Sequence, residues 1–195
     1  MPIIRLTQKL QKEMKLKILD LAVIPGENPA PFTEWYAHLF ILNRRKQLIF
    51  VETQTLFSFS VENVVCKDIR GNLLELFQKR LNRALYIEEV SAEGISKIMD
   101  ISSGEIKFAK TQNRKTIGVM NEFIKQHKFS FSYQGHPVDE RDSCNRYMPM
   151  HGFSDDSKDY KYPIDVFSRV LQEQWAIDFK SHKYDFLRRE EKSSP

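Results

Sequence analysis

Three apolar runs between Trp35 and Val61 form the clearest pattern along the chain. Polar residues separate these runs at positions 43–46 and 52–54. Valine, isoleucine and aromatic side chains fit a pleated, half-buried surface, so each run predicts a β-strand. Connections this short make neighbouring strands antiparallel. In the first run, apolar residues occupy both alternating faces, which predicts a central strand covered on two sides.

The same reasoning predicts the remaining elements. Strands are predicted at Ile3–Leu6, Trp35–Leu42, Gln47–Val51, Thr55–Val61 and Glu105–Ala109, with a further short strand at Phe129–Tyr133. Apolar residues at helical spacing predict helices at Gln8–Leu16, from Asp68 to Leu85, at Ser91–Asp100, at Ile117–His127 and from Pro163 onward. The predicted fold class is α+β, with a mainly antiparallel sheet of about five strands packed against helices.

The pattern also suggests how the chain is organised. We expect an α+β core over residues 1–133, an irregular loop over 134–162, a C-terminal helix over 163–187 and a mobile tail over 188–195. Pro163 suits the first position of that helix, and its apolar stripe must dock on another surface. The chain's own core and a second copy are both open, so we expect a monomer or a homodimer.

Composition narrows the class of protein. Of 195 residues, 41% are hydrophobic and 29% are charged, which is ordinary for a globular domain. Thirty Lys and Arg against 26 Asp and Glu give a net charge of +4, which permits a nucleic-acid partner without requiring one. Cys66 and Cys144 alone cannot form a disulfide framework. We find neither a signal-peptide pattern nor a membrane-spanning run, so we expect a cytoplasmic protein without membrane contact.

The first candidate site is the tip of the predicted hairpin. Arg44, Arg45 and Lys46 follow one another there, and aromatic residues flank them in the adjoining strands. Cations can bind phosphates while aromatic rings stack on bases, an arrangement that suits single-stranded nucleic acid. The alternative is a solvated charged turn between strands whose aromatic residues belong to the core.

The second candidate site lies where a predicted strand leads into a predicted helix. Asn113 and Arg114 stand at this junction, and Asn121 follows on the helix. The start of a helix offers unpaired backbone N–H groups, and an arginine adds a planar cation, so the combination suits a phosphate or a carboxylate. Ordinary turn chemistry explains the same residues, because asparagine bonds readily to its own backbone.

The third candidate site is the irregular loop. It concentrates six residues capable of acid–base, nucleophilic or metal chemistry: His136, Asp139, Glu140, Asp142, Cys144 and His151. A thiol, an imidazole and a carboxylate can form a nucleophilic constellation. The spacing matches no standard zinc pattern, and surface loops often collect such residues. We therefore predict no metal and no cofactor.

Several segments of the chain form a recognisable pattern. They are Trp35-Tyr36-Ala37-His38-Leu39, Arg44-Arg45-Lys46 to Phe50, Thr55-Leu56-Phe57, the stretch Thr111-x-Asn113-Arg114-x-x-x-Gly118-x-Met120-Asn121, the motif Asn145-Arg146-x-x-Pro149-Met150 and Tyr162-Pro163. Together they resemble a bacterial family of unknown function. The resemblance brings no activity, cofactor or catalytic residue. It implies a small bacterial cytosolic protein, from a mobile-element neighbourhood.

These observations lead to two functional hypotheses. The first is a binding module for nucleic acid or another acidic partner, using Arg44, Arg45, Lys46, Asn113, Arg114 and Asn121. The alternative is a hydrolase of RNA or a phosphate ester that uses His136, Asp142, Cys144 and His151. The first requires a continuous basic surface, and the second requires a pocket where those side chains meet.

Overall fold

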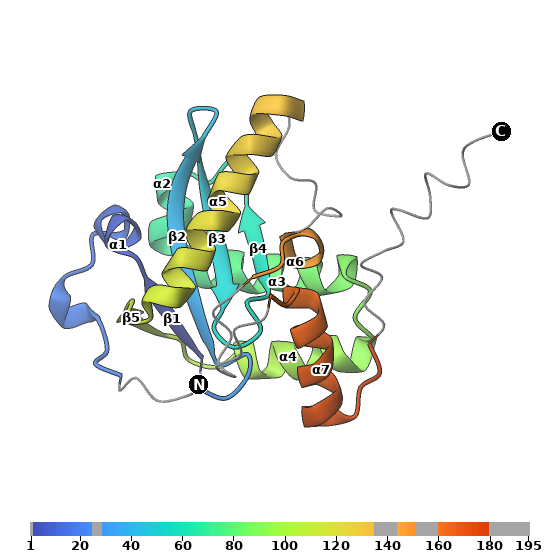
Figure 1. The fold of residues 1–195 in the computed structure, drawn as a ribbon. Helices are drawn as coiled ribbons and strands as arrows, with labels where there is room; N and C mark the ends of the chain where they lie inside the picture. Colours follow the sequence, from blue (N-terminus) through green and yellow to red (C-terminus); the bar gives the residue numbers. More distant parts are fainter. Residues whose placement is uncertain (1, 25–28, 135–143, 151–159, 180–195) are drawn as a thin grey trace.

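A five-stranded sheet forms the centre of the protein (Figure 1). The computed structural model describes residues 2–24, 29–134, 144–150 and 160–179. The strands are β1 (Ile3–Leu6), β2 (Glu34–Leu42), β3 (Arg45–Glu52), β4 (Ser58–Val61) and β5 (Lys107–Lys110). Their order across the sheet is β4-β3-β2-β1-β5, which places the long strands β2 and β3 in the interior.

Helices precede, connect and follow these strands. They are α1 (Gln8–Met14), the 3₁₀ turn η1 (Ile18–Asp20), α2 (Cys66–Gly71), α3 (Leu73–Ile87), α4 (Ala92–Ser102), α5 (Arg114–Gln134), α6 (Cys144–Tyr147) and α7 (Pro163–Trp175). Pro163 occupies the first turn of α7, as the sequence predicts. The oxygen of Ser91 accepts a hydrogen bond from the backbone N–H of Gly94 and so caps α4.

The sheet combines antiparallel and parallel pairing. Strands β2 and β3 pair antiparallel from Trp35↔Glu52 to Leu42↔Arg45, and β3 pairs antiparallel with β4. Strand β1 runs parallel to both of its neighbours, β2 and β5. The α+β class is therefore confirmed, and antiparallel pairing covers the longest strands. The parallel pairs arise because β1 reaches its neighbours through long connections, the first of which contains α1.

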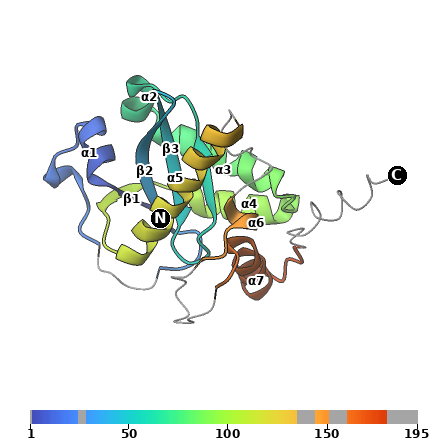
Figure 2. The same ribbon diagram turned by 45° about the horizontal axis from the view of Figure 1, so that its top comes forward.

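Helices cover both faces of the sheet, as Figures 1 and 2 show. One face carries α5, and its core includes Tyr36, Phe40, Leu42, Val119, Met120 and Phe123. The other face carries α3, α4 and α7, and its core includes Trp35, Phe50, Phe59, Phe77, Ile98 and Phe167. Residues that alternate along β2 divide between these two cores, which confirms the prediction of a strand covered on two sides.

The structure corrects several predicted boundaries; the strand predicted at Thr55–Val61, for example, begins only at Ser58. The predicted strand Phe129–Tyr133 is wrong, because α5 continues through it to Gln134. The helix predicted from Asp68 onward is two helices, separated at Asn72. Helix α7 ends at Trp175, where Ala176 adopts a left-handed conformation, and this end lies well before the predicted residue 187.

The aromatic core gives a direct test of this packing. Phe77 is fully buried and its ring contacts those of Trp35, Phe50 and Phe59. We expect Phe77→Ala to lower the free energy of unfolding by about 3–5 kcal/mol, because it removes buried contacts and leaves a cavity. Trp175 is half-buried and stacks on Phe32. We expect Trp175→Ala to lower the free energy of unfolding by less than Phe77→Ala does.

Tyr86 provides the matched control, because it lies on the same helix as Phe77 but is 76% exposed. Tyr86→Ala should change stability by about 0.5 kcal/mol or less in a urea titration. Equal losses for Phe77→Ala and Tyr86→Ala would contradict the described packing of α3.

Candidate functional site

The connection between β2 and β3 is a two-residue turn with an unusual apex. Asn43 has a φ of 46° and Arg44 has a φ of 61°, so both central residues are left-handed, as in a type I′ turn. Asparagine tolerates this conformation, whereas a residue such as arginine pays about 1–2 kcal/mol for it. Arg44 is exposed. The turn therefore holds a cation at its apex, at a position that favours glycine.

Contrary to the prediction, Arg45 and Lys46 do not belong to the turn, because they are the first two residues of β3. The guanidinium of Arg45 donates to the side-chain oxygen of Asn63 over 3.2 Å and stays exposed. Lys46 Nζ lies 2.9 Å from Cys66 Sγ and 2.9 Å from Glu13 Oε1. The hydrogen bond with Cys66, and then that with Glu13, raises the pKa of Lys46. Lys46 thus ties the hairpin to α1 and α2.

The first turn of α5 is satisfied from within the chain. Asn113 Oδ1 accepts hydrogen bonds from the backbone N–H groups of Lys115, at 2.8 Å, and Thr116, at 3.3 Å. The hydroxyl of Tyr36 accepts from the N–H groups of Gln112, at 3.2 Å, and Asn113, at 2.8 Å. Asn113 is therefore a helix cap. Of the backbone donors on which the predicted anion site depended, those of Asn113, Lys115 and Thr116 are thus used within the chain.

Arg114 and Asn121 are exposed residues of α5. A helix of 21 residues is about 30 Å long, and Arg114 stands at its first residue. The opposite end of α5 lies beside the hairpin tip (Figure 1). Arg114 is consequently separated from the hairpin cations, whereas Asn121 lies between the two ends of α5, one helical turn before Lys125.

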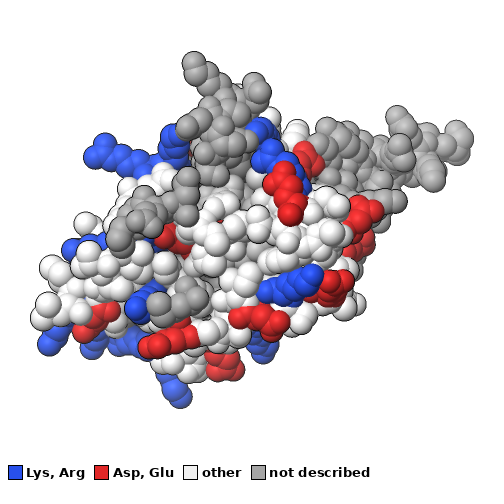
Figure 3. Space-filling model, turned by 90° about the horizontal axis from the view of Figure 1, so that it is seen from below, with Lys and Arg blue, Asp and Glu red and all other residues white. Residues whose placement is uncertain are grey.

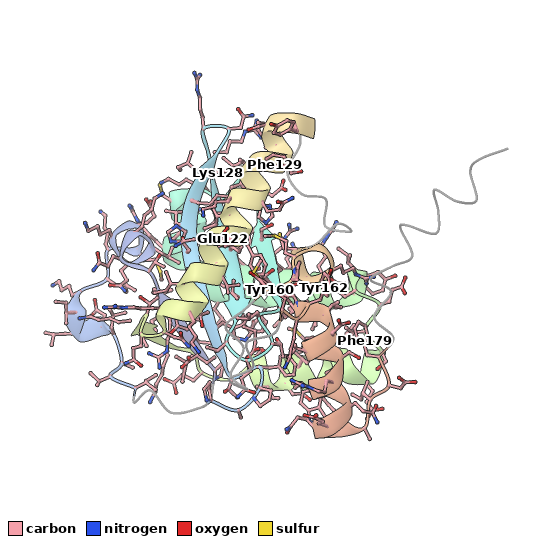
Figure 4. The ribbon with its side chains drawn as sticks, viewed as in Figure 1. Glu122, Lys128, Phe129, Tyr160, Tyr162 and Phe179 are labelled. Atoms are coloured by element: carbon pink, nitrogen blue, oxygen red, sulfur yellow. The ribbon has the colours of Figure 1, made fainter. Side chains whose placement is uncertain are left out.

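Other residues join the hairpin at this end of the molecule. We call the group Arg44, Lys125, Lys128, Phe129 and Tyr133 the hairpin-end surface; each of these side chains is exposed. Figure 4 shows Lys128 and Phe129 near the end of α5 that lies beside the hairpin. The rings of Phe129 and Tyr133 contact each other, with their centroids 4.3 Å apart. The predicted strand over Phe129–Tyr133 hides this pair, although a spacing of four residues also suits one face of a helix.

Charge is mixed on the face of the molecule seen from below, opposite the hairpin tip. Figure 3 shows basic and acidic side chains interspersed there, among larger uncharged areas. Neither positive nor negative charge dominates among the described residues of that face.

The described histidines are structural. His38 Nδ1 lies 2.9 Å from the hydroxyl oxygen of Thr7, and His127 packs near Phe40. Burial, followed by the charges of Lys9 and Lys128, lowers the pKa of His38 to about 4. Burial alone lowers the pKa of His127 to about 4. Both imidazoles are therefore neutral at physiological pH.

Cys144, the only member of the predicted loop constellation within the described residues, is buried. Burial raises the pKa of its thiol to about 12, so it holds its proton at neutral pH and is a poor nucleophile. His136, Asp139, Glu140, Asp142 and His151 lie outside the described residues. Within the described part of the chain, no three His, Cys, Asp or Glu side chains cluster as metal ligands would.

The two residues after Cys144 build a buried polar network. Asn145 accepts hydrogen bonds from the backbone N–H and the hydroxyl of Ser58 and donates to the Ser58 carbonyl and to Glu88. The guanidinium of Arg146 binds the Glu88 carboxylate over 2.5 Å. This network attaches α6 to the outer edge of β4 and to the end of α3. Its polar groups satisfy one another, so its role is structural.

The buried His127 should make the stability of the protein depend on pH. Its folded pKa of about 4 lies below the ordinary value of 6.5, so the unfolded chain binds more protons between these values. The free energy of unfolding should therefore fall as pH decreases from about 6.5 to 4. His127→Phe removes the titrating group and keeps an aromatic ring beside Phe40. The wild type should lose up to about 3 kcal/mol more than the variant across this range. Parallel stability curves from urea titrations would contradict a buried neutral His127.

Comparison with known proteins gives a family but no activity. Curated proteins and solved structures yield no match to this chain. Among the described residues, no helix is both long and apolar enough to cross a membrane. The model of one family, described as a domain of unknown function, matches residues 3–166, which span the sheet, α5 and the start of α7. The chain therefore belongs to the DUF6933 family.

Proposed function

We propose that this protein is a binding module for a polyanion, with nucleic acid as the foremost candidate, and that the hairpin-end surface makes the contact. The observation that carries the proposal is the position of Arg44. It is exposed at the apex of a turn where its φ of 61° favours glycine. A cation held there at a backbone cost is well placed to reach a partner, and residues in strained conformations often serve function.

The neighbouring charges support the same proposal. Arg45 is exposed beside Arg44, and Lys128 extends from the adjacent end of α5. Lys125 forms an exposed pair with Glu122 over 2.6 Å, which is worth little in water and can be exchanged for a phosphate. A polyanion that contacts several of these cations releases bound counterions, so its affinity falls as salt rises.

Among the residues of the alternative hydrolase hypothesis, only Cys144 is described, and its state favours binding over catalysis. The buried Cys144 thiol retains its proton, and His38 and His127 are buried or half-buried as neutral imidazoles. None of them combines exposure with a pKa near neutrality, as a general base or an activated nucleophile requires.

Arg44→Gly tests this proposal while protecting the fold. Glycine suits the left-handed position, so the variant should be as stable as the wild type or up to about 1 kcal/mol more stable. It should bind a labelled RNA or DNA oligonucleotide more weakly, as measured by fluorescence anisotropy at several salt concentrations. Loss of one phosphate contact should reduce the slope of log affinity against log salt by about 0.7–0.9.

Arg114→Ala is the matched control, because it removes the same charge at the far end of α5. Its salt slope should stay at the wild-type value, and its thermal stability should change little because Arg114 is exposed. Equal effects of both substitutions would indicate a response to net charge alone. A loss seen only with Arg114→Ala would move the site to the start of α5.

A further inference from the structure

Two exposed aromatic residues of α5, Phe129 and Tyr133, lie at the same end of the molecule as the hairpin cations. Phe129 is 55% exposed and Tyr133 is 76% exposed, and their rings are tilted by 36°. The aromatic residues that flank the hairpin cations in the sequence cannot serve a ligand, because Trp35, Tyr36, Phe40 and Phe50 are all buried in the cores. Phe129 and Tyr133 thus supply the exposed aromatic rings that the buried residues of the hairpin strands cannot.

Two rings four residues apart on a helix share one face, so both point to the same side of α5. Lys125 precedes Phe129 by one turn on this face, and Lys128 stands beside it in sequence. The surface therefore offers ring faces and positive charges together. A polyanion without bases, or an acidic peptide, would use the charges and gain little from the rings.

We infer that the ligand of this surface is single-stranded nucleic acid, whose bases stack on Phe129 and Tyr133 while its phosphates contact Arg44 and Lys128. This inference rests on the proposed polyanion-binding function and specifies its ligand. Every base has a π-face, and stacking on an aromatic side chain needs an unpaired, accessible base. In a duplex the bases are already stacked on one another, so only the phosphates would remain for this surface.

The chain supplies an unusually close control for Tyr133. Tyr86 on α3 is also 76% exposed, and it belongs to a helix on the opposite face of the sheet. Tyr86→Ala and Tyr133→Ala therefore remove the same side chain at the same exposure. Both substitutions should leave the melting temperature nearly unchanged, because alanine favours a helix and little packing is lost.

The experiment compares three probes by fluorescence anisotropy and competition at one salt concentration. They are a single-stranded DNA oligonucleotide of about 16 nucleotides, the same sequence as a duplex, and inorganic polyphosphate. The wild type should prefer the single strand. Phe129→Ala and Tyr133→Ala should each weaken single-strand binding by about fivefold to a hundredfold. Neither should change competition by polyphosphate, and Tyr86→Ala should match the wild type.

The outcomes separate this inference from the proposed function. If all three probes bind equally well and Tyr133→Ala has no effect, the protein is a polyanion-binding module but the stacking inference is wrong. If Tyr133→Ala weakens polyphosphate as much as the single strand, the ring supports the surface without touching bases, and the inference is again wrong. If the wild type binds none of the probes at low salt, the proposed function fails and the inference fails with it.

Discussion

The rest of the structure depends on the burial of β2 on both faces. Its alternating side chains enter two different cores, one under α5 and the other under α3 and α7. A one-residue slip against β3 would exchange the two sets, so packing fixes the register from Trp35↔Glu52 to Leu42↔Arg45. That register leaves two residues for the turn, which forces Asn43 and Arg44 into left-handed conformations. The left-handed conformation of the turn, Arg44 included, is therefore a consequence of the core, whereas the choice of arginine there is not.

Buried polar groups fix the loops around this core. The fully buried Glu52 carboxylate accepts hydrogen bonds from the backbone of Phe32, Gln54 and Thr55 and from the Thr55 hydroxyl. Burial raises its pKa, although these donors oppose the shift. Asn145 plays a similar part at the edge of β4. Asn113 and Asn145, which both belong to the pattern that resembles the family, thus make hydrogen bonds that hold α5 and α6 in place.

Local pattern was enough to predict the strands of the hairpin and most helices, because alternation and helical spacing are local properties. The local pattern gave the wrong element at Phe129–Tyr133, because apolar residues at this spacing fit both a strand and one face of a helix. In the structure these residues belong to α5. The partners of Asn145 lie 87 and 57 residues away in sequence, so no local pattern reveals them. Of the proposed hairpin-end surface, Arg44 is identified from the sequence, whereas the place of Phe129 and Tyr133 at the same end depends on how α5 crosses the sheet.

The central claim is that ligand contact is confined to the hairpin end of the molecule. Titration of isotope-labelled protein with a single-stranded oligonucleotide, followed by amide chemical shifts in NMR spectra, tests it most directly. We predict that the largest changes fall at residues 43–45 and 125–133, with little change at residues 112–118. Changes centred on residues 112–118, or spread evenly over the exposed lysines and arginines, would contradict the claim.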